Sequence, residues 1–402
     1  MQIESEPFEF NEHDRSRGEQ VQATKTSGQR VYLDYASHTP AHEDVLAEFC
    51  RVERECIGNA MSSHAVGRTA RAEVERVTAG IATLVGVRPS EVIFTSGASE
   101  ANNLAIKGIA RAHVHKGRHI LATCLEHPSV SATLSFLHEA GFEVELVRVM
   151  PSGEVDLGHL KSVLRADTIL FCVSAVDSEL GVVQPLEEIA ETVRRAPNCL
   201  LHVDGAQAVG KLPEALKCKV ADTFCFTPHK FYGLGGFGVL VKREGLVIEP
   251  MIHGGGLSVY RGGTPSPAMA AACFKAMQLA YENIGEWAHA ASALRQYVID
   301  SLKTCNQVRV NSPVNGSPYI LNLSVQGIKG MEMQAELDSR GVAVSVKSAC
   351  SVVGSPSRPV LAVSGDKKNA LCSWRVSFSH LTTIRELDYF LKVLNEIIGA
   401  KQ

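Results

Sequence analysis

The chain has 402 residues, 45% of them hydrophobic and 21% charged, and its formal net charge at pH 7 is −3. That length allows two packed domains, and that composition is ordinary for a globular protein. The charge balance shows no basic surplus, so we expect no nucleic-acid partner. No apolar run approaches the roughly eighteen residues that a membrane span needs, so we expect no membrane role.

The first thirty residues are polar and turn-prone, and they include Glu4, Glu6, Glu9, Glu12 and Glu19. A secretory signal needs an apolar core, and a transit peptide is normally poor in acidic residues. Residues 1–30 match neither description, so we expect a flexible N-terminal tail.

Short apolar runs alternate with longer amphipathic stretches from residue 31 onward. The runs that predict strands are Val31–Asp34, Glu91–Phe94, His119–Ala122, Glu143–Val147, Thr168–Val173, Leu200–Val203, Thr223–Phe226 and Gly238–Val241. Helices are predicted between them, among others at Thr69–Val85, Ser129–Glu139 and Leu186–Arg194. This alternation favours an α/β fold built on a mostly parallel sheet.

The pattern changes near Pro267. A long helix is predicted from Ala268 to about Cys305, followed by short apolar segments at 319–324 and 342–346 and a closing helix over 383–398. We therefore predict a large domain of residues 31–266 and a small α/β domain of residues 267–402.

The eleven cysteines are scattered through the chain, and no two form a C-x-x-C pair. A disulfide framework or a zinc site needs tighter spacing. We therefore expect reduced thiols, no metal site and a cytoplasmic protein. Most cysteines, such as Cys172 and Cys225, lie in apolar runs and are expected to be inert core residues.

Small residues follow the predicted strand that ends at Phe94, in the segment Phe94-Thr-Ser-Gly-Ala-Ser-Glu-Ala-Asn-Asn. A helix that begins after Gly97 offers free backbone N–H groups and the positive end of its dipole, and Ser99 adds a hydroxyl. A phosphate is the natural ligand of such a turn. An ordinary strand-to-helix turn with a serine cap would have the same sequence.

Asp204 and Lys230 each follow an apolar strand, where open α/β sheets bind their ligands. A carboxylate such as Asp204 suits a protonated pyridine nitrogen, although this segment by itself also fits an Asp that caps a helix. A partly desolvated lysine suits Schiff-base chemistry, although a lone loop lysine is usually solvated. Together with the phosphate turn, the two side chains indicate pyridoxal phosphate (PLP) anchored by Lys230.

These segments, in this order, resemble the cysteine desulfurase group of the class V, fold type I PLP enzymes, from about Val31 to the C-terminus. The resemblance lies in Tyr32-Leu-Asp-Tyr-Ala-Ser-His-Thr-Pro, Gly58-Asn-Ala-Met-Ser-Ser-His, Thr95-Ser-Gly-Ala-Ser-Glu-Ala-Asn-Asn, Glu126-His, Glu179-Leu-Gly-Val-Val-Gln, His202-Val-Asp-Gly-Ala-Gln, His229-Lys and His253-Gly-Gly-Gly. It implies a large domain with a mostly parallel sheet of the seven-stranded type and a small C-terminal α/β domain.

The resemblance also implies roles for single residues. His127 would stack on the PLP ring and move protons, Asp204 would pair with the ring nitrogen, and Gln207 would contact the ring hydroxyl. The phosphate would be held by Gly97, Ala98, Ser99, Thr227 and His229. Thr264 would reach the cofactor of the partner subunit, which implies a homodimer with active sites at the subunit interface.

Arg375 matches the arginine that binds the substrate carboxylate in this family. The role agrees with its chemistry, because a guanidinium group binds a carboxylate through two parallel hydrogen bonds. The implied substrate is L-cysteine.

Cys350 differs from the other cysteines because it lies among small and polar residues, which predict an exposed loop. Lys347 nearby would favour the thiolate. The triplet Ser348-Ala-Cys resembles the active-site loop of group I desulfurases, which implies a persulfide on Cys350 and sulfur transfer to an acceptor or scaffold protein, for iron–sulfur clusters, thiolated RNA or another product. An exposed, unreactive cysteine is the alternative.

Three departures from the family pattern keep other functions open. Asp177 stands where the family usually has an asparagine beside the cofactor, Lys347 stands where a glycine is usual, and Ser351-Val differs from the common Thr-Ser. One alternative is a selenocysteine or cystine C–S lyase of the same fold, in which Cys350 is dispensable. The other is a degenerate PLP-fold subunit that acts as a scaffold.

Overall fold

The computed structural model describes residues 30–346 and 354–401, except for the side chains of residues 214–217. Seven strands form its main sheet, in the order β2-β8-β7-β6-β5-β3-β4. They are β2 (Val92–Thr95), β3 (His119–Thr123), β4 (Glu143–Val147), β5 (Thr168–Ser174), β6 (Leu200–Asp204), β7 (Thr223–Phe226) and β8 (Gly238–Lys242). Only β8 runs antiparallel to its neighbours, so the mostly parallel sheet predicted from the sequence is confirmed.

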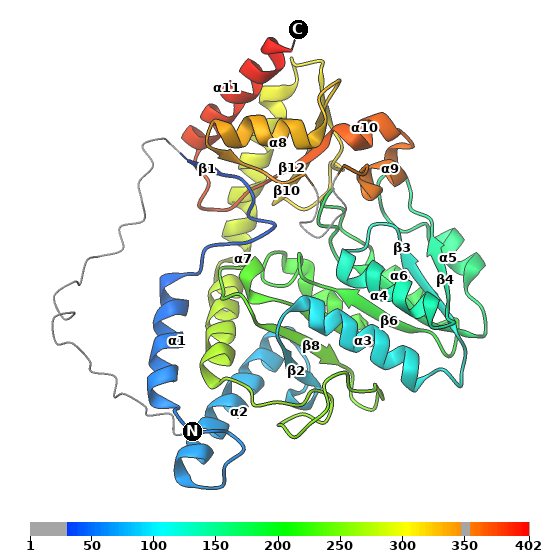
Figure 1. Cartoon of the computed structure of the whole chain (residues 1–402), viewed down its shortest axis with the longest axis vertical. Coiled ribbons are helices and arrows are strands. Elements are labelled where there is room, and N and C mark those ends of the chain that lie inside the picture. The colour runs from blue at the N-terminus through cyan, green and yellow to red at the C-terminus, as the bar shows by residue number, and fades with distance from the viewer. Residues whose placement is uncertain (1–29, 347–353, 402) are drawn as a thin grey trace, which may run out of the picture.

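Helices cover both faces of this sheet (Figure 1). The helices in this part of the chain are α1 (Glu43–Glu55), α2 (Ala65–Val85), α3 (Ala98–Ala112), α4 (Pro128–Glu139), α5 (Leu157–Val163) and α6 (Leu186–Val193). Alternate residues of one strand enter different cores: Leu170 and Cys172 pack with α3 and α4, whereas Phe171 and Val173 belong to the core with α2 and α6. Side chains of a strand point alternately to the two faces of the sheet, and here both faces are buried. Both sets of side chains in such a strand are therefore mainly apolar, which is why the sequence shows unbroken apolar runs.

The C-terminal part contains a second, smaller sheet. It has the order β12-β10-β9, with β9 (Val308–Val310), β10 (Ile320–Val325) and β12 (Ser373–Ser377). The helices here are α7 (Pro267–Leu302), α8 (Gly330–Ser339), α9 (Arg358–Ser364), α10 (Lys367–Cys372) and α11 (Ile384–Ala400). Helix α7 is long enough to run from beside α1 up to this smaller sheet (Figure 1).

The first described strand joins the end of the chain rather than its neighbours in sequence. β1 (Val31–Tyr32) pairs in parallel with β11 (Val342–Ala343), and it lies beside α11 in Figure 1. The next residues continue this contact, since Asp34 forms a bridge with Ser377. The segment that follows β1 is thereby placed between the two sheets.

Three further helical segments, each a 3-10 helix, lie in the described part of the chain. They are η2 (Pro89–Glu91), η3 (Pro213–Val220) and η4 (Pro228–Lys230). η4 follows β7 directly and carries Lys230, so the carboxyl edge of the main sheet determines where this lysine lies. None of the helices in the described residues is long and apolar enough to cross a membrane.

Candidate active site

A cavity of about 370 Å³ lies at the carboxyl ends of β5, β6 and β7. The position is expected because parallel strands leave an open edge where their loops diverge. The cavity brings together most of the residues that the sequence predicted for the cofactor and substrate: Gly97, Ala98, Ser99, His127, Asp204, Gln207, Thr227, His229, Lys230 and Arg375.

Lys230 reaches the cavity from η4. Its Nζ donates hydrogen bonds to the carbonyl oxygens of Ala36 at 2.9 Å and Ser37 at 2.7 Å. Both carbonyls belong to the segment after β1, so the N-terminal segment positions the amine. Tyr232, two residues further on, has a φ of 66° and is held there by a hydrogen bond from its backbone N–H to Thr39 and by its hydroxyl contact with Ser379.

Asp204 ends β6 and is buried. Its Oδ2 accepts a hydrogen bond from the side-chain amide of Asn102 at 2.8 Å, and its Oδ1 accepts one from the backbone N–H of Ala206 at 3.0 Å. These donors fix the orientation of the carboxyl group at the end of β6, where it can pair with a protonated pyridine nitrogen.

Asn102 connects Asp204 to three further polar groups. Its Nδ2 also donates to Ser129 Oγ at 2.9 Å, and its Oδ1 accepts from His202 Nε2 at 2.9 Å and from Cys225 Sγ at 2.9 Å. The sequence shows Asn102 within a family motif, but no role was predicted for it. A signal was present: a polar residue on the apolar side of a predicted helix needs partners when it is buried.

His127 precedes α4 and serves as its N-cap. Its Nδ1 accepts the backbone N–H of Ser129 at 3.1 Å, so the ring carries its proton on Nε2 when neutral. Burial lowers the pKa of this imidazole, so the neutral form prevails at neutral pH. The side chain lines the cavity, with Nε2 as the nitrogen that remains for proton transfer.

The start of α3 forms one end of the cavity. Gly97 is the N-cap and has no side chain to occupy the first N–H groups of the helix, which leaves them for a ligand. A Cβ atom on Gly238, the first residue of β8, would lie 2.5 Å from the carbonyl carbon of Gly97. Any larger residue at position 238 would clash with the backbone of Gly97, so this close packing of β8 against the turn requires a glycine.

Thr227 and His229 lie at the same end. The hydroxyl of Thr227 is 2.8 Å from His229 Nδ1 and donates to the carbonyl of Phe237 at 2.8 Å. Burial lowers the pKa of His229 to about 3, so this ring is neutral. Neutral hydroxyl and imidazole groups beside a helix N-terminus suit a phosphate.

Arg375 lies on β12, which carries it to the cavity from the smaller sheet. Its guanidinium donates to Asp34 Oδ1 at 2.8 Å, to Ser37 Oγ at 2.7 Å and to the carbonyl of Ser178 at 2.6 Å. The buried Nε–H has no hydrogen-bond partner among the described residues. A pre-oriented cation with an unused donor is a suitable binding group for a substrate carboxylate.

Asp177 does not line the cavity, but its neighbours Val176 and Ser178 do. Its Oδ2 accepts the backbone N–H groups of Glu179 and Leu180, while the buried Oδ1 has no partner in the described part of the chain. Burial, with the nearby Glu179, raises the pKa of Asp177 to about 7. Asp177, which departs from the family pattern, therefore keeps its proton up to about pH 7.

Glu126 is a second buried acid near the cavity. Thr123 and Ser174 donate hydroxyl hydrogen bonds to its two oxygens, at 2.6 Å and 2.7 Å, and burial raises its pKa to about 7. Glu126 ties β3 to the end of β5, directly before His127. Glu126, in the Glu126-His motif, therefore has a structural role: it links two neighbouring strands beside the cavity.

Cys350 and Lys347 lie outside the described residues. On their N-terminal side, Ser345 forms an antiparallel bridge with Arg375, which lines the cavity. On their C-terminal side, Ser357 Oγ donates to Glu179 Oε2 at 2.6 Å, and Glu179 follows the lining residue Ser178.

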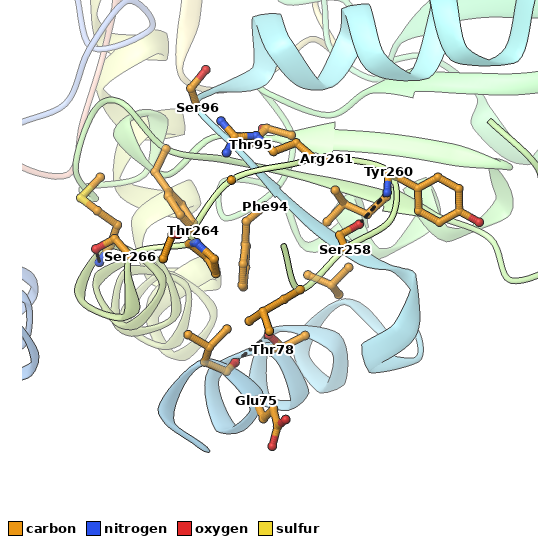
Figure 2. A pocket seen from close by; sticks show the side chains of 18 of the residues that line it. Glu75, Thr78, Phe94, Thr95, Ser96, Ser258, Tyr260, Arg261, Thr264 and Ser266 are labelled. Carbon is orange, nitrogen blue, oxygen red and sulfur yellow. Dashed lines mark hydrogen bonds between the residues drawn. The ribbon is translucent and has the colours of Figure 1, made fainter. Parts of the chain in front are cut away.

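Thr264 lies in a different cavity, of about 640 Å³ (Figure 2). The loop that carries Thr264 is fixed by Arg261, whose Nε donates to Glu100 Oε1 at 2.9 Å. This cavity is also lined by Phe94, Thr95 and Ser96, which precede α3, and Ser96 lines the Lys230 cavity as well (Figure 2). Thr264 therefore does not join the other predicted cofactor residues within one chain.

The residues of the Lys230 cavity fit PLP. PLP carries a phosphate, a ring nitrogen and an aldehyde. The cavity offers the free N–H groups at the start of α3, the Asp204 carboxylate and the Lys230 amine. The turn that would hold the phosphate contains Gly97 and packs closely against Gly238.

Comparison with known proteins agrees with this geometry. The family model of the aminotransferases of class V matches residues 31–390. The chain is 36% identical to the cysteine desulfurase IscS of Dictyoglomus turgidum, over 92% of this chain and 94% of the relative. It is 35% identical to the IscS of Neisseria gonorrhoeae, over 92% of each chain.

Solved structures show the same likeness. A NifS-like protein superposes with a TM-score of 0.86 at 33% sequence identity, covering 92% of this chain and all of the solved one. The family match, residues 31–390, extends over the two sheets and so over every element that contributes to the Lys230 cavity. The chain belongs to the aminotransferase class-V family, within its cysteine desulfurases.

Proposed function

We propose that this protein is a PLP-dependent cysteine desulfurase that converts L-cysteine to L-alanine and leaves the sulfur as a persulfide on Cys350. The observation that carries the proposal is one cavity with Lys230, Asp204 and Arg375 on its walls. Ser345, five residues before Cys350 in the sequence, forms a bridge with Arg375.

Lys230, Asp204 and the phosphate turn would hold PLP, with Gln207 beside the ring hydroxyl and His127 over the ring. Bound there, PLP supplies an electron sink for the electron pair released at the substrate Cα. Asp204 would pair with the ring nitrogen, and Asn102 and Ala206 hold its carboxyl group in place by donating to it.

Arg375 binds the carboxylate of L-cysteine and so orients the substrate in the cavity. Its position is fixed before substrate arrives, because Asp34 and Ser37 already hold the guanidinium. A pre-oriented group loses little conformational entropy on binding. Lys230 Nζ and His127 Nε2 are then the atoms that move protons near Cα.

Cys350 takes the sulfur. Its thiolate attacks the sulfur of the bound cysteine, a new S–S bond forms, and the bond between Cβ and sulfur breaks. The electron pair of the broken bond stays on the carbon side, which is protonated and released as alanine. The two thiol groups supply the two electrons, so no external oxidant or reductant is needed.

The persulfide on Cys350 would pass its sulfur to an acceptor or scaffold protein. A homodimer would complete the site, with Thr264 of one subunit reaching the phosphate in the other. Support for this arrangement is the location of Thr264, which lies on a loop outside its own Lys230 cavity yet beside the turn that begins α3.

The test is incubation with L-cysteine and PLP, with alanine and sulfide assayed together. We expect alanine from the wild type, with sulfide released when a thiol reductant is present. Lys230→Ala should lose the absorbance of bound PLP and all activity. Cys350→Ala should keep the absorbance and lose alanine formation. Alanine formation that persists in Cys350→Ala, or pyruvate and ammonia in place of alanine, would contradict the proposal and favour a lyase.

A further inference from the structure

Lys211 is a buried lysine for which no role follows from the mechanism above. It is 5% exposed, and burial lowers its pKa to about 7. Within the described part of the chain, its Nζ contacts the side-chain oxygen of Gln207 at 2.8 Å and the ring of Tyr319 at 5.2 Å. Neither contact carries a negative charge, and a buried ammonium without a carboxylate is costly.

A chain of hydrogen bonds leads from Lys211 to the catalytic lysine. Lys211 donates to Gln207 Oε1, and Gln207 Nε2 donates to the carbonyl of Ala36 at 2.7 Å. The same carbonyl accepts from Lys230 Nζ at 2.9 Å. Because Lys211 can only donate, it fixes which end of the Gln207 amide is oxygen and which end is the donor.

The charged groups around Lys211 are mainly cations. Lys230 from η4 and Arg375 from β12 both lower its pKa by repulsion, and Lys211 in turn lowers the pKa of His229. Tyr319, before β10, presents a neutral ring because burial raises its pKa. Arg375 has a carboxylate partner, Asp34, but Lys211 has none in the described residues.

We propose that Lys211 is a positioning residue of the cofactor site: it fixes the Gln207 amide, and its ammonium charge is balanced only when an anionic ligand of the pyridoxal phosphate type fills the cavity. The inference rests on the proposed function. Its physical basis is that Gln207, the hydrogen-bond partner of Lys211, lines the Lys230 cavity, so an anionic ligand in that cavity lies one side chain away from the ammonium group.

The proposal has a consequence for pH. An anion in the cavity stabilises the ammonium form, so ligand binding raises the pKa of Lys211 above its value of about 7 in the free protein. Binding then takes up a proton in the pH range above 7, and affinity falls as pH rises through that range. Below pH 7 Lys211 is protonated in both states and adds no pH dependence.

The test uses 4′-deoxypyridoxine 5′-phosphate, which keeps the phosphate and ring hydroxyl of PLP but lacks the aldehyde that reacts with Lys230. Its dissociation constant is measured by calorimetry from pH 6.5 to pH 9 for the full chain. The variants are Lys211→Met, which removes both charge and donor, and Lys211→Gln, which keeps a donor without the charge. Lys211→Gln carries the test if Lys211→Met does not fold.

Lys242 supplies a matched control. It is also buried, it contacts the Tyr260 ring at 4.6 Å, and its Nζ donates only to the backbone carbonyls of Arg243 and Leu246. Unlike Gln207, none of these partners lines the Lys230 cavity. Lys242→Met should bind the probe with the pH dependence of the wild type.

We expect the affinity of the wild type to fall about tenfold more between pH 7 and pH 9 than that of either Lys211 variant. Equal pH dependence in the wild type and both Lys211 variants would overturn the inference while leaving the proposed function intact. Failure of the wild type to bind the probe at any pH would instead count against the PLP site itself.

Discussion

Asn102 shows how a single buried amide can order several polar groups of the site. Its oxygen accepts from His202 and Cys225, and its nitrogen donates to Asp204 and Ser129, so its hydrogen-bonding capacity is fully used. Burial lowers the pKa of His202 to about 4, so this ring is a neutral donor through Nε2. Each of the four hydrogen bonds of Asn102 therefore joins one donor to one acceptor.

Asn102→Leu should weaken PLP binding. The change removes a donor from Asp204 and leaves His202 Nε2 without its acceptor, so we expect about tenfold weaker binding. Titration of the apoprotein with PLP, followed by absorbance, measures the change. Asn103→Ala is the control, because the neighbouring Asn103 donates only to the exposed carbonyl of Ser99. PLP affinity equal to that of the wild type in Asn102→Leu would show that Asp204 does not depend on this amide.

Asp177→Asn should stabilise the protein above neutral pH. The pKa of the buried Asp177 is raised to about 7, so the folded state keeps a proton that the unfolded state loses from about pH 4 upward. The loss of stability caused by Asp177 is therefore absent at low pH and complete above pH 7. The variant should gain roughly 2–4 kcal/mol of unfolding free energy at pH 8 and nothing near pH 4. Urea unfolding at both pH values tests it, and an equal gain at the two would contradict the raised pKa.

At the scale of elements, the sequence predicts local structure better than long-range pairing. The strands β4 and β7 have the bounds that alternation and apolar runs predict, and α2 begins only four residues before its predicted start. The pairing of β1 with β11 was not predicted, because partners about 310 residues apart carry no local signal. That pairing matters for the site, since it places the Ala36 carbonyl that Lys230 contacts.

Gly238→Ala should disrupt the turn that begins α3. The added Cβ would lie 2.5 Å from the Gly97 backbone, so either β8 or the turn must shift. We expect PLP to bind about tenfold or more weakly, because the helix N–H groups move with the turn. Gly285→Ala is the control, since a Cβ at that α7 position meets no atom within 4 Å. PLP binding by Gly238→Ala as tight as by the wild type would mean that this turn does not hold the phosphate.

At the scale of the whole molecule, the site depends on both sheets. The main sheet provides Asp204 and Lys230, while the smaller sheet provides Arg375 and one anchor of the Cys350 segment. The sequence predicted most of these groups from their motifs. It could not show that Asp34 and Ser37 hold Arg375, because those contacts join residues from opposite ends of the chain. The domain boundary at residues 266 and 267 stays a prediction.

The central claim is that Cys350 receives the sulfur of cysteine. Its most direct test is the mass of the Cys350 peptide after brief incubation of the PLP-loaded protein with L-cysteine, followed by alkylation and digestion. We predict a gain of about 32 Da on that peptide, one sulfur atom, which a thiol reductant removes. Alanine production with no added sulfur on the Cys350 peptide would contradict the claim.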